Sequence, residues 1–207
     1  GAWEADVLPA RLQEYDPLWL DGLCLSGAVA WGRLSPAAPS NGHKSGPIRA
    51  TPTAIFKRER GDVWRSLAAQ PDSGALPLSH AGRAVLGTLD ERGASFFGDL
   101  VNATGLLRTE VEKGLGELVA WGLVSSDSFA GLRALLVPSE RRRPIGGFRR
   151  RGRAAAFGIE TAGRWSRVRR GSPLSEEQLA EAVAWQLLRR YGVVFRDLLG
   201  REWLPEG

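Results

Sequence analysis

The sequence predicts an α+β fold made of tandem winged-helix modules, one complete and two partial, with small β-hairpin wings. The main observation is the central segment 79–137, in which three stretches of helical periodicity precede two short apolar runs. Segment 16–56 has the order helix, strand, loop and strand, which matches the second half of such a module. The stretch 192–202 resembles the stretch 93–103, so a further module is expected to begin near the end of the chain.

In the central module, the first helix is expected to begin after Ser79 and to end at Gly93. A short second helix follows, and a third is expected over 108–121. The face of the third helix that should be buried carries four apolar side chains at helical spacing: Val111, Leu115, Leu118 and Val119. The runs 123–124 and 132–137 are predicted to be the two strands of the wing, joined by a polar turn.

These patterns divide the chain into four regions. Residues 1–70 are predicted to form a partial winged-helix-like module of helix, strands and loop, and residues 71–138 the complete winged helix. Residues 139–174 are rich in Arg and Gly without a sustained period, as in an arm or linker. Residues 175–207 open with a capping box and are predicted to be the truncated start of a further winged helix.

Composition and charge narrow the class of protein. The chain has 207 residues, of which 43% are hydrophobic, so it can bury a core. No apolar run reaches the length of a membrane span, and the single cysteine, Cys24, excludes an internal disulfide framework, so a cytoplasmic protein is expected. The sequence contains no methionine, and we therefore expect it to be a piece of a longer protein.

The net charge of +5 is unevenly distributed. Segment 139–171 holds eleven arginines against Glu140 and Glu160, a local balance of 11 − 2 = +9. The remainder of the chain therefore sums to 5 − 9 = −4. The basic segment is thus expected to supply contacts to a polyanion, or to act as a solubilising linker, and the sequence leaves both readings open.

Signatures of catalysis and metal binding are missing from the sequence. We find no phosphate-cradling loop, and two histidines with one distant cysteine do not make a zinc site. The carboxylates of the central helices are expected to be ordinary surface charges. The chain by itself is therefore predicted to be no enzyme and to hold no cofactor.

Three groups of residues are candidates for nucleic-acid contacts. The third helix of the central module exposes Arg108 and Lys113 among acidic neighbours, a mixed face that favours a structural role over groove reading. Trp31, followed by Arg33 at the end of a strand, is expected either to stack on an exposed base or to be core. The residues of the basic arm that are expected to track a backbone and stack on bases are Arg149, Arg150, Arg151, Arg153, Trp165 and Arg167.

Several long blocks in order resemble the bacterial large helicase-related (Lhr) proteins. They are VLPARLQEYDPLWLDGLCLSGAVAWGRL, GASFFGDLVNATGL, ELVAWGLVSSDSFAGLRALL, GRWSRV and QLLRRYGVVFRDLLGRE. The resemblance covers nearly the whole chain, and its loosest part is the basic arm. Lhr proteins are superfamily 2 ATP-dependent DNA helicases, and the matching part is the accessory C-terminal region of the helicase core.

The resemblance implies a 3′-to-5′ translocase that unwinds DNA duplexes or RNA:DNA hybrids in DNA repair. ATP and magnesium would be handled by ATPase domains of the same protein that this sequence lacks. The implied partners are single-stranded DNA or an RNA:DNA hybrid, together with those ATPase domains, and no membrane. In the family a tryptophan of this region stacks on a base of the tracking strand; Trp31 is the best positional match, and Trp3 is the second candidate.

Two other classes of protein are alternatives to a helicase segment, and each would require sequence features of its own. The winged-helix arrangement also resembles bacterial DNA glycosylases that excise damaged bases, but their catalytic Gln-x-Gln motif is missing here. A winged-helix transcription regulator is disfavoured by the acidic residues of the third helix and by the two partial modules.

Overall fold

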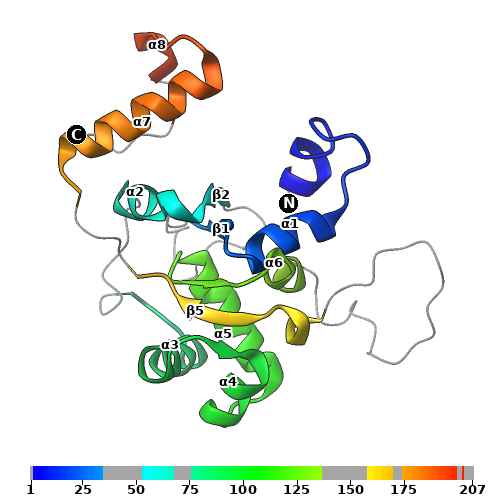
Figure 1. The fold of residues 1–207 in the computed structure, drawn as a ribbon. Helices are drawn as coiled ribbons and strands as arrows, with labels where there is room; N and C mark the ends of the chain where they lie inside the picture. Colours follow the sequence, from blue (N-terminus) through cyan, green and yellow to red (C-terminus); the bar gives the residue numbers. More distant parts are fainter. Residues whose placement is uncertain are drawn as a thin grey trace.

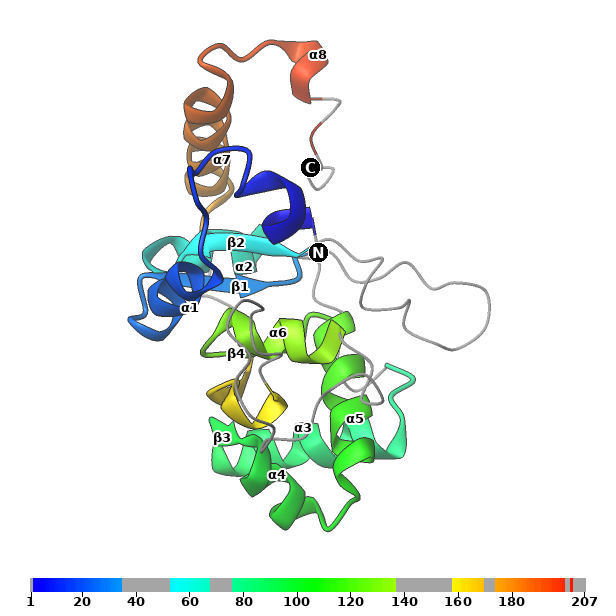
Figure 2. The same ribbon diagram turned by 90° about the vertical axis from the view of Figure 1, so that its right-hand side faces the viewer.

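The computed structural model describes residues 2–34, 53–67, 76–136, 158–169, 174–199 and 202. Figure 1 shows two small sheets with helices around them, and α7 (Glu176–Tyr191) at one end of the molecule. Figure 2 shows the same arrangement from the side, with α7 near β2 and α2 and far from α4. The predicted α+β class is confirmed by this mixture of helices and small sheets.

The N-terminal part builds a two-stranded sheet. A helical turn, η1 (Trp3–Val7), precedes α1 (Pro17–Leu25), which begins at a proline after the N-cap Asp16, as its sequence predicts. The strands β1 (Val29–Gly32) and β2 (Ala54–Lys57) then pair antiparallel. A 3₁₀ turn, η3 (Arg58–Arg60), and the helix α2 (Gly61–Leu67) complete this part.

The central part has the topology of a winged helix. It contains, in chain order, α3 (His80–Arg92), β3 (Ser95–Phe96), α4 (Phe97–Thr104), α5 (Arg108–Ala120), β4 (Val124–Ser126), α6 (Phe129–Leu136), η5 (Ile159–Thr161) and β5 (Arg164–Arg167). The strands form one antiparallel sheet in the order β3–β5–β4. Three helices with such a sheet make up the module, and α6 and η5 lie in the wing between β4 and β5.

The prediction of a wing strand over 132–137 was wrong, because residues 129–136 form the helix α6. This segment reads FAGLRALL, and short apolar runs of good helix formers fit a strand and a buried helix equally well. The second wing strand is instead β5, which lies in the region predicted as an arm. The sheet of the central module therefore takes its middle strand from beyond the boundary expected at residue 138.

The core of the central module lies where α3 packs against α5. Leu115, Leu118 and Val111 on α5 are fully buried, as the helical spacing predicts, and they meet Val85 and Leu89 of α3 in one apolar cluster. Leu115 loses essentially all of its surface to solvent. Burial of each such side chain stabilises the fold by about 1.5–3 kcal/mol, so this seam holds the module together.

The C-terminal part begins as its capping box predicts. Ser175 accepts a hydrogen bond from the backbone N–H of Gln178 at 3.2 Å, and the Gln178 side chain accepts one from the Ser175 N–H at 2.9 Å. The helix α7 ends at Gly192, whose φ of 75° favours glycine, and α8 (Arg196–Leu199) follows. Trp185 of α7 is 50% exposed.

Candidate nucleic-acid interface

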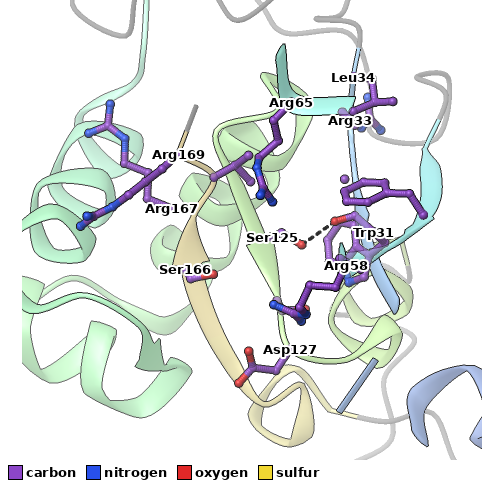
Figure 3. Close-up of a pocket in the computed structure, with 15 residues that line it drawn as sticks. Trp31, Arg33, Leu34, Arg58, Arg65, Ser125, Asp127, Ser166, Arg167 and Arg169 are labelled. Atoms are coloured by element: carbon purple, nitrogen blue, oxygen red, sulfur yellow. Dashed lines mark hydrogen bonds between the residues drawn. The ribbon is translucent and has the colours of Figure 1, made fainter. Parts of the chain in front are cut away.

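A surface pocket of about 280 Å³ lies between the β1–β2 hairpin and the β4–β5 pair of the wing sheet. Figure 3 shows how its walls come together from three parts of the chain: β1, the η3–α2 segment, and the strands β4 and β5. Ser125 of β4 donates its hydroxyl hydrogen to the carbonyl oxygen of Trp31 at 2.8 Å, which joins the two sheets at the floor of the pocket. We call this site the arginine pocket.

Positive charge dominates the lining of the arginine pocket. Five arginines contribute to it: Arg33, Arg58, Arg65, Arg167 and Arg169. Asp127 is the one carboxylate among the described lining residues, which gives a formal balance of 5 − 1 = +4. Arginine presents several N–H donors in a planar fork that matches phosphate oxygens, so this lining suits a polyanion.

Arg33 and Arg58 occupy opposite environments within the pocket. Arg33, which directly follows β1, is 5% exposed, and this burial lowers the pKa of its guanidinium to about 10. It therefore still carries its charge at neutral pH. Arg58 is exposed, and its guanidinium forms no hydrogen bond or ion pair with any residue that the structure describes. In Figure 3, Arg58 and Arg65 extend from η3 and α2 toward β4.

Ion pairs neutralise part of the remaining charge. Arg65 bonds to Asp62 at 2.7 Å, one turn away on α2. Arg167 of β5 pairs with Asp90 at the end of α3. Asp127 accepts from the Arg164 guanidinium at 3.0 Å, so the pocket's carboxylate is itself paired. Arg169, past the end of β5, is exposed.

The structure places the three tryptophans that were candidates for stacking. Trp31 is 2% exposed, and its indole N–H donates to the Ser128 carbonyl oxygen at 3.0 Å. Trp165 is 0% exposed and lies in the middle strand of the wing sheet. Neither indole has an open face for a base, because each fills the core beneath a strand. Trp3 is half-buried, and its indole N–H donates to the Thr53 carbonyl oxygen at 2.6 Å.

The other candidates are not brought together with the arginine pocket. Arg108 pairs with Glu160 of η5 and lies over the ring of Phe97 at 5.2 Å, which is a structural role. Lys113 is exposed on α5. Of the predicted residues that the structure describes, the pocket includes Trp31, Arg33 and Arg167. Arg149, Arg150, Arg151 and Arg153 lie outside the described residues.

Sequence reasoning missed Arg58 and Arg65, and it did not single out Arg169 within the basic segment 139–171. The available signal was the basic run after the second strand, Lys57 and Arg58 followed by Arg60, which looks like an ordinary solvated turn. These residues approach one another only because the hairpin packs on the wing. Such a long-range packing contact leaves no local pattern.

The part of the chain that the structure describes holds neither a metal-binding cluster nor a membrane-spanning helix. No group of three or more His, Cys, Asp or Glu side chains there is arranged to hold a metal ion. Among the helices of those same segments, none combines the length and apolar character needed to cross a bilayer. Cys24, the one cysteine, is buried and unpaired with another thiol.

The sheet order, the three helices and the arginine pocket define a winged-helix protein with a cationic site beside its wing. A family model described as "Large helicase-related protein, winged-helix domain" matches residues 1–53. The chain is 30% identical, over its whole length, to a Mycolicibacterium smegmatis protein named Lhr helicase/probable uracil glycosylase. It is also 27% identical, over 99% of its length, to the Lhr helicase/uracil glycosylase of Escherichia coli.

The chain is thus similar to large helicase-related (Lhr) proteins over its whole length, and residues 1–53 match a winged-helix model of that family. It spans 14% of the length of each of these two curated relatives. The resemblance seen in the sequence blocks is therefore confirmed, and it concerns one segment of proteins that are several times longer.

Proposed function

We propose that this chain is a nucleic-acid-binding accessory segment of an ATP-dependent DNA helicase of the Lhr family. It guides a single strand while ATPase domains elsewhere in the protein hydrolyse ATP with magnesium. The observation that carries the proposal is the arginine pocket, where five arginines from β1, η3–α2 and β5 surround one opening. Translocation in the 3′-to-5′ direction, unwinding of DNA duplexes or RNA:DNA hybrids in repair, and a cytoplasmic location belong to the same proposal.

The pocket suits backbone contact better than base reading. Its cationic groups are guanidinium forks and Ser166 adds a hydroxyl group, and groups of these kinds contact phosphate without selecting a sequence. A segment along which strands of any base sequence must move needs contacts that do not depend on the bases. Arg149, Arg150, Arg151 and Arg153 belong to the segment between β4 and β5, and we propose that they extend the same cationic surface.

The test is the salt dependence of binding to single-stranded DNA, measured by fluorescence anisotropy with the 207-residue chain. Each phosphate contact that is lost lowers the slope of log affinity against log salt by about 0.7. Arg58→Ala should therefore weaken binding and flatten the slope. The triple change of Arg149, Arg150 and Arg151 to alanine should flatten it further.

Arg11→Ala is the matched control. Arg11 is exposed, bonds only locally to the Val7 carbonyl oxygen, and does not line the pocket. Arg11→Ala removes the same charge from the chain as Arg58→Ala does, but at a site outside the pocket. It should therefore leave the salt slope unchanged. Equal effects of Arg58→Ala and Arg11→Ala would mean that binding depends on total charge, and the proposed role of the pocket would be wrong.

A DNA glycosylase is the second candidate, because both relatives carry uracil glycosylase in their names. The arginine pocket does hold one carboxylate, Asp127, and an excision reaction needs such a group to activate water. That carboxylate is paired with Arg164, whose guanidinium occupies one of its oxygens. Release of uracil from single-stranded DNA by the chain, abolished by Asp127→Asn, would favour this candidate over the helicase segment.

A further inference from the structure

Asp127 is the one carboxylate among the described residues that line the arginine pocket. It directly follows β4, and in Figure 3 the Arg58 side chain reaches from η3 toward the end of β4, where Asp127 lies. The structure describes no hydrogen bond or ion pair between these two side chains, although their charges are opposite and they line the same opening. The carboxylate therefore opposes the binding of phosphate that the arginines favour.

The Asp127 side chain is held in place by the start of β5. Its Oδ2 accepts a hydrogen bond from the Arg164 guanidinium at 3.0 Å and a longer one from the Arg164 backbone N–H at 3.4 Å. The backbone N–H of Asp127 donates in return to the Arg164 carbonyl oxygen at 3.0 Å. Gly163 is also close, because a Cβ added there would lie 3.1 Å from the Asp127 Cβ. The negative charge is thus a fixed feature of the pocket.

The local fold does not require this charge. The Oδ1 atom of Asp127 accepts no hydrogen bond from any residue that the structure describes. An asparagine would keep an oxygen for the Arg164 backbone N–H. The Arg164 side chain is 54% exposed, so its ion pair with Asp127 adds little to stability. The main effect of the charge therefore falls on what enters the pocket.

Repulsion by a fixed carboxylate depends on the charge of the entering anion, because the Coulomb energy is proportional to the product of the two charges. An internal phosphodiester of a nucleic-acid strand carries one negative charge. A phosphate monoester carries about −1.5 to −2 near pH 7, and free di- and triphosphates carry more. Asp127 therefore opposes small, multiply charged phosphates more strongly than it opposes a strand.

Guanidinium groups alone would select in the other direction. Arg58 and Arg65 also attract anions in proportion to charge, so a purely cationic lining would favour a free polyphosphate over a phosphodiester. ATP, which the proposed ATPase domains hydrolyse, would then compete with the strand for the same arginines. One carboxylate among them reduces that advantage of the polyphosphate.

We propose that Asp127 is a specificity-determining residue, through which the arginine pocket discriminates against free di- and triphosphates and stays available to the phosphodiesters of a strand. The inference rests on the proposed function, because it concerns which anion occupies the pocket. It differs from the glycosylase candidate, in which Asp127 would activate water. There its substitution would abolish a reaction, whereas here the same substitution tightens binding.

The test measures two affinities of the 207-residue chain at constant ionic strength. The first is for labelled oligothymidylate without terminal phosphates, followed by anisotropy, and the second is for inorganic pyrophosphate as its competitor. Asp127→Asn should tighten strand binding by about 3- to 30-fold, and pyrophosphate binding by about the square of the measured factor. Asp127→Glu retains the charge and should keep the wild-type ratio of the two affinities.

Asp99→Asn is the matched control. Asp99 is exposed on α4 and does not line the pocket, so the same loss of charge there should change neither affinity. The melting temperature of each variant is measured alongside. Because asparagine retains the hydrogen bond to the turn, Asp127→Asn should melt within a few degrees of wild type.

Equal tightening of strand and pyrophosphate in Asp127→Asn would overturn the inference, because the carboxylate would then weaken binding without selecting the ligand. Unchanged affinities for both ligands, with Arg58→Ala still weakening the strand, would also overturn it and would leave the proposed function standing. Weaker strand binding by Asp127→Asn would show that the carboxylate contacts the strand instead of repelling it. If Arg58→Ala had no effect on strand binding either, the proposed function would fail together with the inference.

Discussion

The indole N–H of Trp31 donates a hydrogen bond to the carbonyl oxygen of Ser128 at 3.0 Å, across 97 residues of sequence. The backbone carbonyl of Trp31 accepts in turn from the Ser125 hydroxyl at 2.8 Å. The β1 strand is thereby bonded to the wing through both its side chain and its backbone. Because Arg33 directly follows this strand, the same bonds place its guanidinium at the arginine pocket.

Trp31→Ala should lower the free energy of unfolding by about 3–5 kcal/mol, the usual cost of emptying a large aromatic site in a core. Trp31→Phe should cost less, because a ring remains to pack edge-on against Phe129, now at 6.2 Å, and the lost hydrogen bond is worth about 1 kcal/mol. Urea unfolding followed by circular dichroism measures both. The control is Trp19→Ala on the surface; if it destabilised as much as Trp31→Ala, the core assignment of Trp31 would be wrong.

Arg133 of α6 holds the N-terminal part against the wing. Its guanidinium donates to both carboxylate oxygens of Glu4, at 2.7 and 2.8 Å, and to Asp21 at 2.7 Å. The second oxygen of Asp21 accepts from the backbone N–H of Ala130 at 2.8 Å. The Arg133 side chain is 20% exposed, so water screens these bonds only in part.

Arg133→Ala should therefore cost about 1.5–3 kcal/mol, the range for hydrogen bonds to charged groups. This substitution leaves the carboxylates of Glu4 and Asp21 without their cation at a half-buried site. Arg164→Ala is the comparison, because its pair with Asp127 has an arginine side chain that is 54% exposed. An exposed pair of that kind contributes about 0–1 kcal/mol. Similar melting temperatures for the two variants would show that the Arg133 bonds do not hold the two parts together.

The sequence predicted those elements whose signals are local. The helical spacing of Val111, Leu115 and Leu118 identifies the buried face of α5, and the capping box at Ser175 identifies the start of α7. Each of these is decided within one or two turns of chain. The fold class follows from them, since a run of helices with short strands leaves few ways to bury their apolar faces.

The errors occurred where distant contacts decide the structure. The α6 segment is short and apolar enough to be a strand, and its helical form places Phe129 against Trp31 and Arg133 against Glu4. The β5 strand has a single fully buried side chain, Trp165, in a stretch rich in arginine. Its pairing with β3 and β4 spans dozens of residues, so periodicity does not reveal it.

The site was harder to predict than the fold. Arg33 and Arg167 were identified from the charge near an aromatic residue, but Arg58 and Arg65, which line the same pocket, come from a different turn of the chain.

The thiol of Cys24 should be unreactive in the folded protein. Burial, and then the neighbouring Asp21 carboxylate, raise the pKa of this thiol to about 11. The unfolded value is about 8.5, so the folded state favours the protonated form. This contribution to stability is fully present below about pH 8.5 and is lost as the pH rises through about 11.

Two measurements check this prediction. A thiol reagent at about pH 8 should label Cys24 slowly in the native chain and quickly in urea. The free energy of unfolding should also fall between about pH 8.5 and about pH 10.5 more steeply for wild type than for Cys24→Ala. The comparison concerns the slopes, because the substitution also removes buried volume. Rapid native labelling would contradict the burial of this side chain.

Two glycines, each within a helix, should respond in opposite directions to the same substitution. A Cβ added at Gly114 of α5 would lie 3.0 Å from the carbonyl carbon and oxygen of Ala81 and 3.2 Å from the backbone nitrogen of Gly82. All three are backbone atoms of α3, so they cannot rotate away, and the two helices would have to separate. At Gly87 of α3, an added Cβ would meet no atom within 4 Å.

Gly114→Ala should therefore destabilise the chain by about 1–3 kcal/mol, the usual cost of overpacking a well-fitted contact. Gly87→Ala should stabilise it by about 0.4–1 kcal/mol, because alanine restricts the unfolded chain and fits the helix without strain. Urea unfolding of both variants gives the sign directly. Because the residue types and the element type match, helix propensity cancels between the variants. Stabilisation by Gly114→Ala would show that α3 and α5 do not approach as closely as the structure has them. The packing described here for these two helices, which supports the wing and its arginine pocket, would then be wrong.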